Sequence, residues 1–506
     1  MAVPHSRLRA LNAAPERAGG AYVLYWMIAS RRASHSYALD RVAELSRRFG
    51  RPPLVLEALR AGYPHASDRL HRFVLDGMAD NASAFAQKGV AYYPYLEARP
   101  GDGHGLLEAL STRACTVVTD DYPCFFLPRM VSTAAARLKV RLEAVDGNGL
   151  LPMSAAPRVF NTAFSFRGFL QKELSAHLAD RPAADPWHRR ALPPPPDISR
   201  EIALRWPAAK KALLAPASEV LAGLEIDHRV APVPLRGGTG SGRAALRRFV
   251  DERLTRYEED RNHPDLDGSS GLSPFLHFGH LSSHEVFEAV TRAEGWAPHH
   301  LGAERGGRRR GFWGLSAGAE AFLDQLVTWR ELGLNMCSKR DDYLSYDSLP
   351  PWARETLHRH ARDRRSPLYH REAFEAAETH DPLWNAAQRQ LLGEGRIHNY
   401  LRMLWGKKIL EWSAAPEEAL ATMIALNDRY ALDGRDPNSY SGILWCLGRY
   451  DRPWGPERAI LGKVRFMSSE NTARKVRVKR YLERYGEGAL SHPERRGQLT
   501  PGKASS

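Results

Sequence analysis

Four tryptophans stand where their spacing could serve chemistry: Trp384, Trp405, Trp412 and Trp445. They accompany a basic helical run from His398 to Lys408. Trp405 and Trp412 are seven residues apart, so they would share one face of a helix. Aligned indoles can fill a core, stack against bases or pass electrons. The rest of the chain has to decide among these uses.

A nine-residue string, Gly271 to Gly279, contains the serine–proline pair Ser273-Pro274. This pair is typical of a helix start, where a hydroxyl cap and free backbone N–H groups suit a phosphate. An ordinary helix cap explains the pair alone. The full string, Gly-Leu-Ser-Pro-Phe-Leu-His-Phe-Gly, is much rarer than its serine–proline pair.

Two further segments concentrate polar groups. Arg330 and Glu331 are adjacent on a predicted helix, where they could form a core ion pair or clamp a ligand. The turn Asp433–Asn438, preceded by Asn427, carries enough carboxylates and amides to hold the edge of a heterocycle. A solvated loop is the alternative for this turn.

The composition favours a polyanionic partner. The formal net charge is +14, and basic segments at Gly462–Met467 and Arg474–Arg480 could track phosphates. Arginine-rich solvated surfaces are the alternative. The chain lacks the GxGxxG, P-loop, HExxH and GxSxG motifs, so neither a hydrolase nor a nucleotide-driven motor has motif support.

The four cysteines show no CxxC spacing, and no apolar run is long enough to cross a bilayer. We therefore expect a reduced, cytoplasmic protein without a metal site. The basic first twenty residues could imitate a transit peptide, but we expect a flexible tail there.

These residues must be positioned by more than one domain, because 506 residues exceed one ordinary domain. Apolar runs near 21–28, 53–57, 90–93 and 116–119 alternate with helical patterns. This alternation predicts a doubly wound α/β domain with a parallel sheet, and ligands at the carboxyl ends of its strands. We assign it to residues 20–180, after a flexible tail over 1–19.

A Pro- and Gly-rich stretch over 181–241 is predicted to be a long inter-domain linker. Beyond it the 3.6-residue period dominates, which predicts an all-helical domain over 242–485. An arginine-rich insert at 299–318 is predicted to be a mobile surface loop, and 486–506 a flexible C-terminal tail.

In this order and spacing, the strings resemble the photolyase/cryptochrome flavoproteins, specifically the class II cyclobutane pyrimidine dimer DNA photolyases. The strings that carry the resemblance are Gly271–Gly279, Trp329–Leu332, Leu383–Gln388, Tyr400–Lys408, Asp433–Asn438 and Gly462–Met467. The resemblance is densest from Tyr257 to Arg480.

The resemblance implies FAD in the helical domain and the enzyme class of deoxyribodipyrimidine photo-lyases, which are carbon–carbon lyases. The positions that match cofactor contacts are Tyr257, Leu272, Ser273, Arg330, Glu331, Asn427, Asp433 and Asp436. Asn427 matches the amide that faces flavin N5. A second, light-harvesting chromophore of the deazaflavin or folate type is an expectation for the N-terminal domain.

The resemblance also divides the tryptophans. Trp405, Trp384 and Trp412 match an electron-transfer chain that runs from the flavin to the surface. The positions that match contacts to a flipped-out dimer and its DNA are Gln325, Trp329, Met403, Trp445 and Arg465. The implied function is light-driven repair of cyclobutane pyrimidine dimers in DNA by a monomer, and flipping is required because the reacting carbons lie inside the base stack.

Two positions depart from the family pattern. Gln325 stands where a glutamate is usual, with Asp324 beside it, and Ala29–Arg32 replaces an acidic–basic loop. A glutamine can donate to a pyrimidine carbonyl but cannot supply a carboxylic proton. The alternatives are a cryptochrome-like blue-light photoreceptor with weak or no repair, and a light-independent nucleic-acid binder, which leaves the flavin-type strings unexplained.

Overall fold

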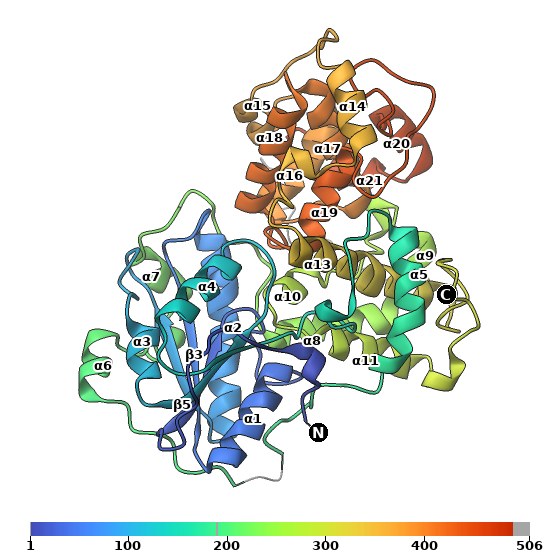
Figure 1. The fold of residues 1–506 in the computed structure, drawn as a ribbon. Coiled ribbons are helices and arrows are strands. Elements are labelled where there is room, and N and C mark those ends of the chain that lie inside the picture. Colours follow the sequence, from blue (N-terminus) through green and yellow to red (C-terminus); the bar gives the residue numbers. More distant parts are fainter. Residues whose placement is uncertain (1, 189–190, 489–506) are drawn as a thin grey trace, which may run out of the picture. The chain divides into compact units, whose positions relative to one another are not determined.

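The computed structural model describes residues 2–188 and 191–488, and the chain forms two compact units (Figure 1). The first comprises residues 1–258, 270–344 and 432–441. The second comprises residues 259–269, 345–431 and 442–506. The predicted C-terminal tail over 486–506 lies outside the described residues from 489 onward.

The first unit contains a six-stranded sheet in the order β1-β6-β5-β2-β3-β4. The strands are β1 Leu8–Ala10, β2 Tyr22–Met27, β3 Pro53–Leu59, β4 Ala91–Leu96, β5 Ala114–Asp120 and β6 Leu142–Val145. Strands β2 to β6 pair in parallel and β1 pairs antiparallel to β6. The strand order reverses direction between β2 and β5, so the predicted doubly wound fold is confirmed and its switch point lies between these two strands.

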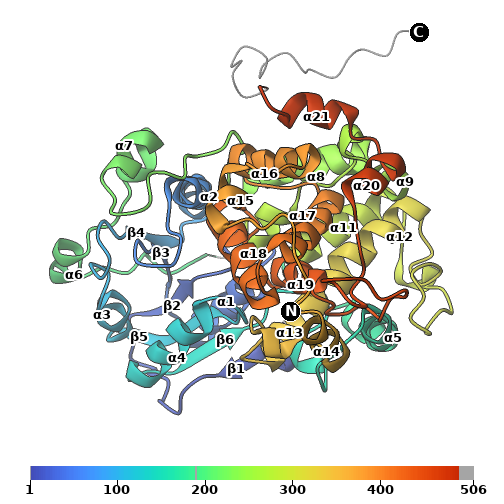
Figure 2. The same cartoon turned by 90° about the horizontal axis from the view of Figure 1, so that it is seen from above.

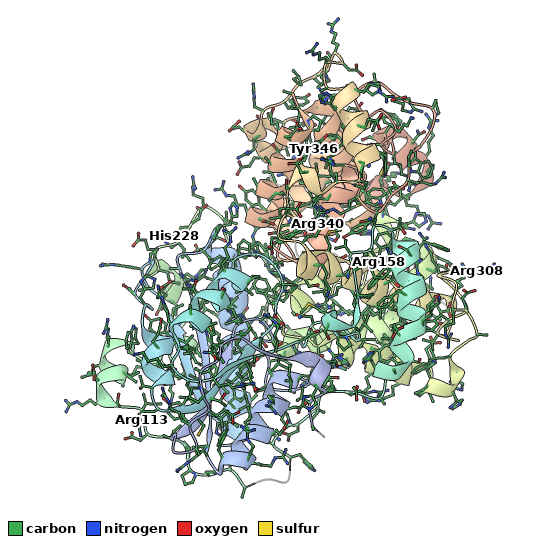
Figure 3. The ribbon with its side chains drawn as sticks, in the orientation of Figure 1. Arg113, Arg158, His228, Arg308, Arg340 and Tyr346 are labelled. Atoms are coloured by element: carbon green, nitrogen blue, oxygen red, sulfur yellow. The ribbon has the colours of Figure 1, made fainter. Side chains whose placement is uncertain are left out.

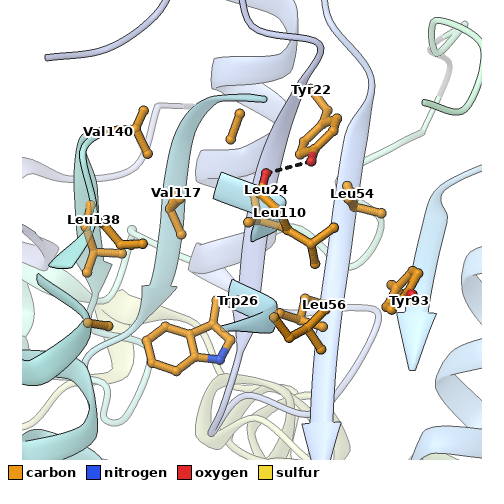
Figure 4. Packing of buried hydrophobic residues seen from close by; sticks show 14 of the residues in the cluster. Tyr22, Leu24, Trp26, Leu54, Leu56, Tyr93, Leu110, Val117, Leu138 and Val140 are labelled. Atoms are coloured by element: carbon orange, nitrogen blue, oxygen red, sulfur yellow. Dashed lines mark hydrogen bonds between the residues drawn. The ribbon is translucent and has the colours of Figure 1, made fainter. Parts of the chain in front are cut away.

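Alternate residues of β2 face opposite sides of the sheet, and all six are buried. One side packs on α3 (Leu106–Ser111) and α4 (Leu127–Arg137), and Figure 4 shows Leu24 and Trp26 in this layer. The other side packs on α1 (Tyr37–Phe49) and on Phe85 of α2 (Asp68–Gln87). Figure 2 shows the strands of this sheet from above. Burial on both faces explains why these strands are continuous apolar runs in the sequence.

The expectation of a flexible tail over 1–19 is wrong for its first part. Residues His5–Arg7 form a short 3-10 helix and Leu8–Ala10 form β1. The Arg7 guanidinium is buried and donates to the backbone oxygens of Asp146, Gly149 and Leu150. A three-residue edge strand shows no period in the sequence, which is why the pattern gave no signal.

The predicted linker over 181–241 carries structure of its own. It forms α6 (Arg200–Arg205) and α7 (Ala217–Ala222), and Trp206 packs into the sheet-side core. The Trp206 indole donates to the oxygen of Asp102 at 2.9 Å. The segment around Trp206 therefore packs on the α/β part of the first unit and is not a separate linker.

Further helices of the first unit are α5 Ala163–Glu173, α8 Thr239–Glu252, α10 Ser273–His277, α11 Ser283–Ala293, α12 Ala317–Leu323 and α13 Arg330–Lys339. A π-helical turn, Asp324–Trp329, joins α12 to α13. This unit continues past the predicted boundary at residue 241. A helical period predicts a helix but not the element on which it packs.

The insert at 299–318 is anchored, contrary to the expectation of a mobile loop. Phe312 and Trp313 are buried, and the Glu320 carboxylate accepts from the N–H groups of Gly311 and Trp313. Arg308, Arg309 and Arg310 of the insert are exposed, and Figure 3 labels Arg308.

The second unit is helical. Its helices include α14 Pro351–Arg359, α15 Arg371–Ala376, α16 Pro382–Glu394, α17 Asn399–Trp412, α18 Pro416–Tyr430, α20 Ser469–Lys475 and α21 Lys479–Tyr485. Two helices have residues in both units, namely α9 Tyr257–Asp260 and α19 Pro437–Cys446. No helix of the described residues is long and apolar enough to span a membrane.

Candidate functional site

Helices α16 and α17 of the second unit position three of the predicted tryptophans. The Asp381 side chain caps α16 and accepts from the N–H groups of Leu383 and Trp384, each at 3.0 Å. A carboxylate at this end also complements the helix dipole. The cap therefore fixes the first turn of α16, where Trp384 lies.

Trp384 and Trp405 form a parallel stack, with ring centroids 6.5 Å apart and an interplanar angle of 5°. The Trp384 indole N–H donates to the backbone oxygen of Trp405 at 3.0 Å. The Trp405 indole donates to Oε1 of Gln388 at 2.9 Å. Both indoles are buried with their N–H groups satisfied, so their orientation is fixed.

Trp412 contacts the other side of Trp384, with centroids 6.1 Å apart at 63°. Trp412 is itself buried, and Tyr369 and the exposed His380 lie against it at 5.8 and 4.8 Å. The structure thus brings together all three predicted tryptophans in the order Trp405, Trp384, Trp412. Their outer end is covered by two side chains that the sequence reasoning missed.

Asn427 lies near the end of α18 and is buried. Its amide Nδ2 donates to Oδ1 of Asp428 at 2.9 Å. This hydrogen bond fixes the side-chain amide of Asn427 beside the Asp428 carboxylate.

A strip of cations and aromatic rings lies elsewhere on the second unit. The Arg465 guanidinium stands 5.8 Å from the Trp445 ring and 4.9 Å from the Trp454 ring. The Arg452 guanidinium also lies over the Trp454 ring, 4.5 Å from its centroid. We call Arg452, Trp454, Arg465 and Trp445 the cation–aromatic strip. Such a strip can both stack on bases and neutralise phosphates.

Trp454 was not among the predicted site residues. Its signal in the sequence was its place between Arg452 and the basic string Gly462–Met467. Met403, which was predicted, lies beside the same helix as Trp445: a Cβ on Gly442 of α19 would stand 3.6 Å from the Met403 Cε.

Lys407 lies beneath Trp445. Its ammonium donates to the oxygen of Cys446 at 2.8 Å and stands 4.7 Å from the Trp445 ring. Burial lowers the pKa of Lys407 to about 8. The lysine therefore closes the carbonyl end of α19 and supports the indole.

In the first unit, the Asp433–Asn438 turn meets the Ser273 helix and the Arg330 helix. The Ser273 hydroxyl donates to Asp433 at 2.7 Å, and the buried Asp436 carboxylate accepts from the Tyr122 hydroxyl at 3.0 Å. Burial favours a raised pKa for Asp436, but His277 and Arg330 outweigh it and lower that pKa. Asp436 is thus an ionised carboxylate inside a polar cluster.

Glu331 has a different environment from Asp436. Its two carboxylate oxygens accept from the N–H groups of Leu150 and Leu151 at 2.7 and 3.1 Å. A Cβ on Gly149 would come within 2.7 Å of this carboxyl group. Burial raises the pKa of Glu331 to about 7. The carboxyl group supports the loop after β6, and its predicted contact with a cofactor stays a prediction.

The π-helical turn begins with Asp324 and Gln325, the latter at the position where the family usually has a glutamate. The Asp324 carboxylate is buried and pairs with Arg167 at 2.7 and 3.2 Å. Gln325 is half-buried, as is Trp329 four residues later. Asp324 is held by its ion pair, so the amide of Gln325 is the polar group on the partly exposed side.

Tyr257 and Leu272 are buried among the residues of the first unit. The Tyr257 ring packs edge-on against Phe249 and Phe322 at 5.5 Å each, and Leu272 is buried. Both therefore serve the core of the first unit, and their predicted contact with a cofactor stays a prediction.

Two relatives cover nearly the whole chain. A deoxyribodipyrimidine photo-lyase from Methanothermobacter thermautotrophicus is 32% identical over 480 residues, which is 94% of this chain and 97% of the relative. A deoxyribodipyrimidine photo-lyase from Oryza sativa subsp. japonica is 32% identical over 513 residues, 98% of this chain and 93% of the relative. The chain belongs to the deoxyribodipyrimidine photo-lyase family.

Solved structures agree with the photolyase fold. A class III photolyase from Agrobacterium tumefaciens superposes with a TM-score of 0.63 at 18% identity, covering 92% of this chain and 86% of that chain. A Synechocystis cryptochrome gives a TM-score of 0.66 at 16% identity, covering 92% and 88%. An archaeal photolyase from Sulfolobus tokodaii, described with two FAD molecules, gives 0.61 at 14%, covering 93% and 91%. No protein-family profile matches the chain.

The donors present in this photolyase-family chain fit a flavin dinucleotide. Ser273 and Arg330 offer a hydroxyl and a guanidinium, which suit a diphosphate. Asn427 offers a buried amide in the unit that holds the three indoles. These donor types suit a group with an anionic chain and a heterocyclic edge.

A cavity of about 370 Å³ opens in the first unit at the carboxyl ends of β2 and β3. Its lining includes Trp26, Tyr63, Phe126, Arg31 and Glu97. The Asp120 carboxylate holds the loop after β2 by accepting from three N–H groups, those of Ile28, Ala29 and Ser30. The cavity lies at the switch point where the sequence predicted a ligand.

The basic loop Ala29–Arg32 divides its two arginines between different tasks. Arg31 lines the cavity and pairs with Glu57 at 3.0 Å. Arg32 is buried and donates to the oxygen of Gly279 at 2.9 Å. Of these two arginines only Arg31 lines the cavity, together with Arg60, Arg137 and Arg435 from other segments.

Proposed function

We propose that this chain repairs cyclobutane pyrimidine dimers in DNA by light-driven electron transfer from reduced FAD to a flipped-out dimer. The observation that carries the proposal is the contact series Trp405–Trp384–Trp412, with centroids 6.5 and 6.1 Å apart, in the same compact unit as the cation–aromatic strip. In this proposal the three indoles transfer electrons and the cation–aromatic strip binds nucleic acid.

FAD, when bound, supplies the electron that light makes available to the dimer. Ser273, Arg330, Asp433 and Asp436 of the first unit match family positions at its polar groups, and Asn427 of the second unit matches the amide beside its ring system. The three indoles carry electrons between the protein exterior and the cofactor side. Burial and hydrogen bonds hold Trp384 and Trp405 at a fixed separation. Because water is excluded, little solvent has to reorganise when an electron passes between them.

The strip and the residues near it would handle the DNA. Family positions that contact a flipped dimer are matched by Met403 and Trp445 in the second unit and by Trp329 and Gln325 in the first, and Arg465 matches the position that enters the gap left by flipping. Two carbon–carbon bonds of the cyclobutane ring break, and the electron returns, so the reaction has no net redox change. A damaged pair also stacks weakly, which lowers the cost of flipping.

We infer a second, light-harvesting chromophore for the cavity at the β2–β5 switch point. Its aromatic walls suit a planar ring system, and Arg31 offers one cation. A deazaflavin, a folate or a second flavin has the required shape. Absorption bands beyond those of one FAD per chain, lost when Trp26 or Tyr63 is replaced by alanine, would support this assignment.

A cryptochrome-like blue-light photoreceptor is the second candidate. Gln325 favours it, because the neighbouring Asp324 is held by Arg167 and cannot replace the usual carboxyl group. Retention of Trp329, Met403, Trp445 and Arg465 favours repair instead.

The deciding experiment combines an absorption spectrum with a repair assay on thymine-dimer DNA in the light and in the dark. Light-dependent loss of dimers supports repair. Bound flavin without repair supports the photoreceptor, and absence of flavin contradicts both candidates.

A further inference from the structure

A tight hairpin in the second unit presents two residues of the cation–aromatic strip. Arg458 and Gly462 exchange backbone hydrogen bonds of 3.0 and 2.8 Å, and the Trp454 N–H donates to the oxygen of Lys463 at 2.8 Å. We call residues 454–465 the strip hairpin, because Trp454 and Arg465 stand at its two ends. Its geometry sets where those two side chains lie.

The strip hairpin lies close against helix α14 through a strained turn. Ile460 has φ of 68°, a left-handed conformation that is unfavourable for a β-branched residue. Its N–H donates to Oδ2 of Asp363 at 2.8 Å. A Cβ on Gly462 would overlap Thr356 and stand 3.0 Å from the His360 ring. Contacts with α14 and the segment after it therefore hold a backbone that would relax if released.

His360 links the two carboxylates of this contact. Its Nδ1 is 2.6 Å from Oδ2 of Asp363, and its Nε2 is 3.1 Å from Oε1 of Glu457 in the hairpin. A carboxylate only accepts, so both ring nitrogens have to donate. A neutral imidazole has one N–H group and can satisfy one of these two partners. The doubly protonated ring is the form that closes both contacts.

The charges around this link are mixed. Arg359 lies 3.3 Å from Glu457, and the positive charge of Lys463 also acts on Glu457. The positive charge of Arg365 acts in the same way on Asp363. The hydrogen bond to Asp363 is the largest cause that raises the pKa of His360 above 6.5, followed in the same direction by Glu457 and opposed by desolvation. Loss of the second ring proton therefore requires a higher pH than in an ordinary histidine.

We propose that His360 is a positioning residue for DNA binding, which bridges Asp363 to Glu457 and thereby holds the strip hairpin with Trp454 and Arg465 presented together. Loss of the second ring proton releases one carboxylate, and the strained turn at Ile460 can then relax. Affinity for dimer-containing DNA falls as a result. This inference rests on the proposed repair function, since it assigns the strip to DNA.

The first test measures the hairpin without DNA. Backbone hydrogen exchange of a peptide covering 454–465 is followed in the full chain at pH 6.0 and 8.5, and variants are compared at equal pH to remove the intrinsic effect of pH. His360→Gln, which keeps a single donor group, should exchange about tenfold faster than wild type at pH 6.0 and about equally at pH 8.5. Glu457→Ala, which removes the acceptor of the Nε2–H group, should behave in the same way.

His358→Gln is the matched control, because His358 is an exposed histidine on the same helix. It should exchange as wild type at both pH values. Equal exchange of His360→Gln and wild type at pH 6.0 would overturn the proposed link, whatever the DNA measurements show.

The second test measures affinity for a thymine-dimer duplex across the same pH range at fixed ionic strength. Wild type and His358→Gln should lose affinity about tenfold more than His360→Gln between pH 6.0 and 8.5. Parallel pH profiles for all three proteins would overturn the role in DNA binding. Failure of wild type to prefer damaged DNA at any pH, with the exchange result intact, would instead contradict the proposed repair function.

Discussion

Trp384 is the residue on which the electron-transfer hypothesis depends most, because it contacts both other indoles. It is fully buried and held by its own N–H group. A phenylalanine at this position keeps the ring packing but removes both the readily oxidised indole and its hydrogen bond.

We expect Trp384→Phe to lose most of its flavin photoreduction under blue light with a thiol reductant, as followed by absorbance. Dimer repair should persist when the flavin is reduced chemically. Trp296→Phe is the control, since that buried indole also donates to a backbone oxygen but lies in the first unit. Equal photoreduction in the two variants would contradict the assigned path.

Gln325 determines whether the lesion contact can deliver a proton. We expect Gln325→Glu to raise the rate of dimer repair by a factor of about ten, because it restores a group able to donate a proton. Gln325→Met, of similar length and without polar atoms, should repair more slowly than wild type. Single-turnover repair of a defined thymine-dimer oligonucleotide compares the three, and identical rates would exclude a contact with the dimer.

The family resemblance, rather than residue spacing, named Trp384, Trp405 and Trp412 as one series; the structure places the three indoles in contact, and their role in electron transfer stays a prediction. Residue types and spacing could not predict that Asp324 pairs with Arg167, since those residues are 157 positions apart in the chain. The burial of Trp412 under Tyr369 likewise depends on a contact between distant segments.

At the scale of elements, helix α16 positions Trp384 through its cap. The Asp381 side chain accepts two backbone N–H groups and a hydrogen bond from the Ser469 hydroxyl. We expect Asp381→Ala to lower the free energy of unfolding by about 1–2 kcal/mol. Asp381→Asn keeps an oxygen acceptor and should lose less. Chemical denaturation measures both, and equal losses would show that the cap oxygen contributes little.

The loop after β6 is the second element whose stability can be tested. Glu331 is expected to have a pKa of about 7 in the folded chain and an ordinary, lower pKa when unfolded. A folded pKa above the unfolded one gives a contribution that is fully present at low pH and is lost as pH rises through about 7.

The stability of wild type relative to Glu331→Gln should therefore fall between pH 5 and 8, by about 2–3 kcal/mol. Urea denaturation at several pH values measures this difference. A difference that stays constant over the range would mean that the carboxyl group keeps one charge state throughout.

Element type was predictable wherever burial imposes a period, as in β2 and α1. The helices inside the 181–241 segment were missed because α6 and α7 are six residues each, shorter than the window in which a period can be recognised. The insert was misjudged because its anchors, Phe312 and Trp313, lie next to a run of arginines and glycines.

At the scale of the whole molecule, the net charge of +14 is the property most relevant to DNA. We expect affinity for dimer-containing duplex to fall at least about tenfold between 50 and 200 mM salt, through release of counterions. Arg465→Gln should reduce the slope of log affinity against log salt by about 1. Titration at several salt concentrations measures the slope, and an unchanged slope would place Arg465 outside the phosphate contacts.

The order of the elements, sheet first and helices after, was visible in the sequence as a change of period. The division into compact units was not, because residues 270–344 and 432–441 group with the sheet-containing part. A period shows that a helix buries one face, but the identity of the surface that covers it comes from complementary shapes that a single sequence does not display.

The short strand β1 has a consequence for how copies of this chain meet. An uncovered sheet edge offers a row of free backbone groups to a neighbouring molecule, and natural proteins blunt such edges with short strands and charges. Here the outermost strand beside β6 is three residues long, and its exposed Arg9 pairs with Asp121 at 2.7 Å. The short strand Leu8–Ala10 therefore disfavours edge-to-edge association with another molecule on that side of the sheet.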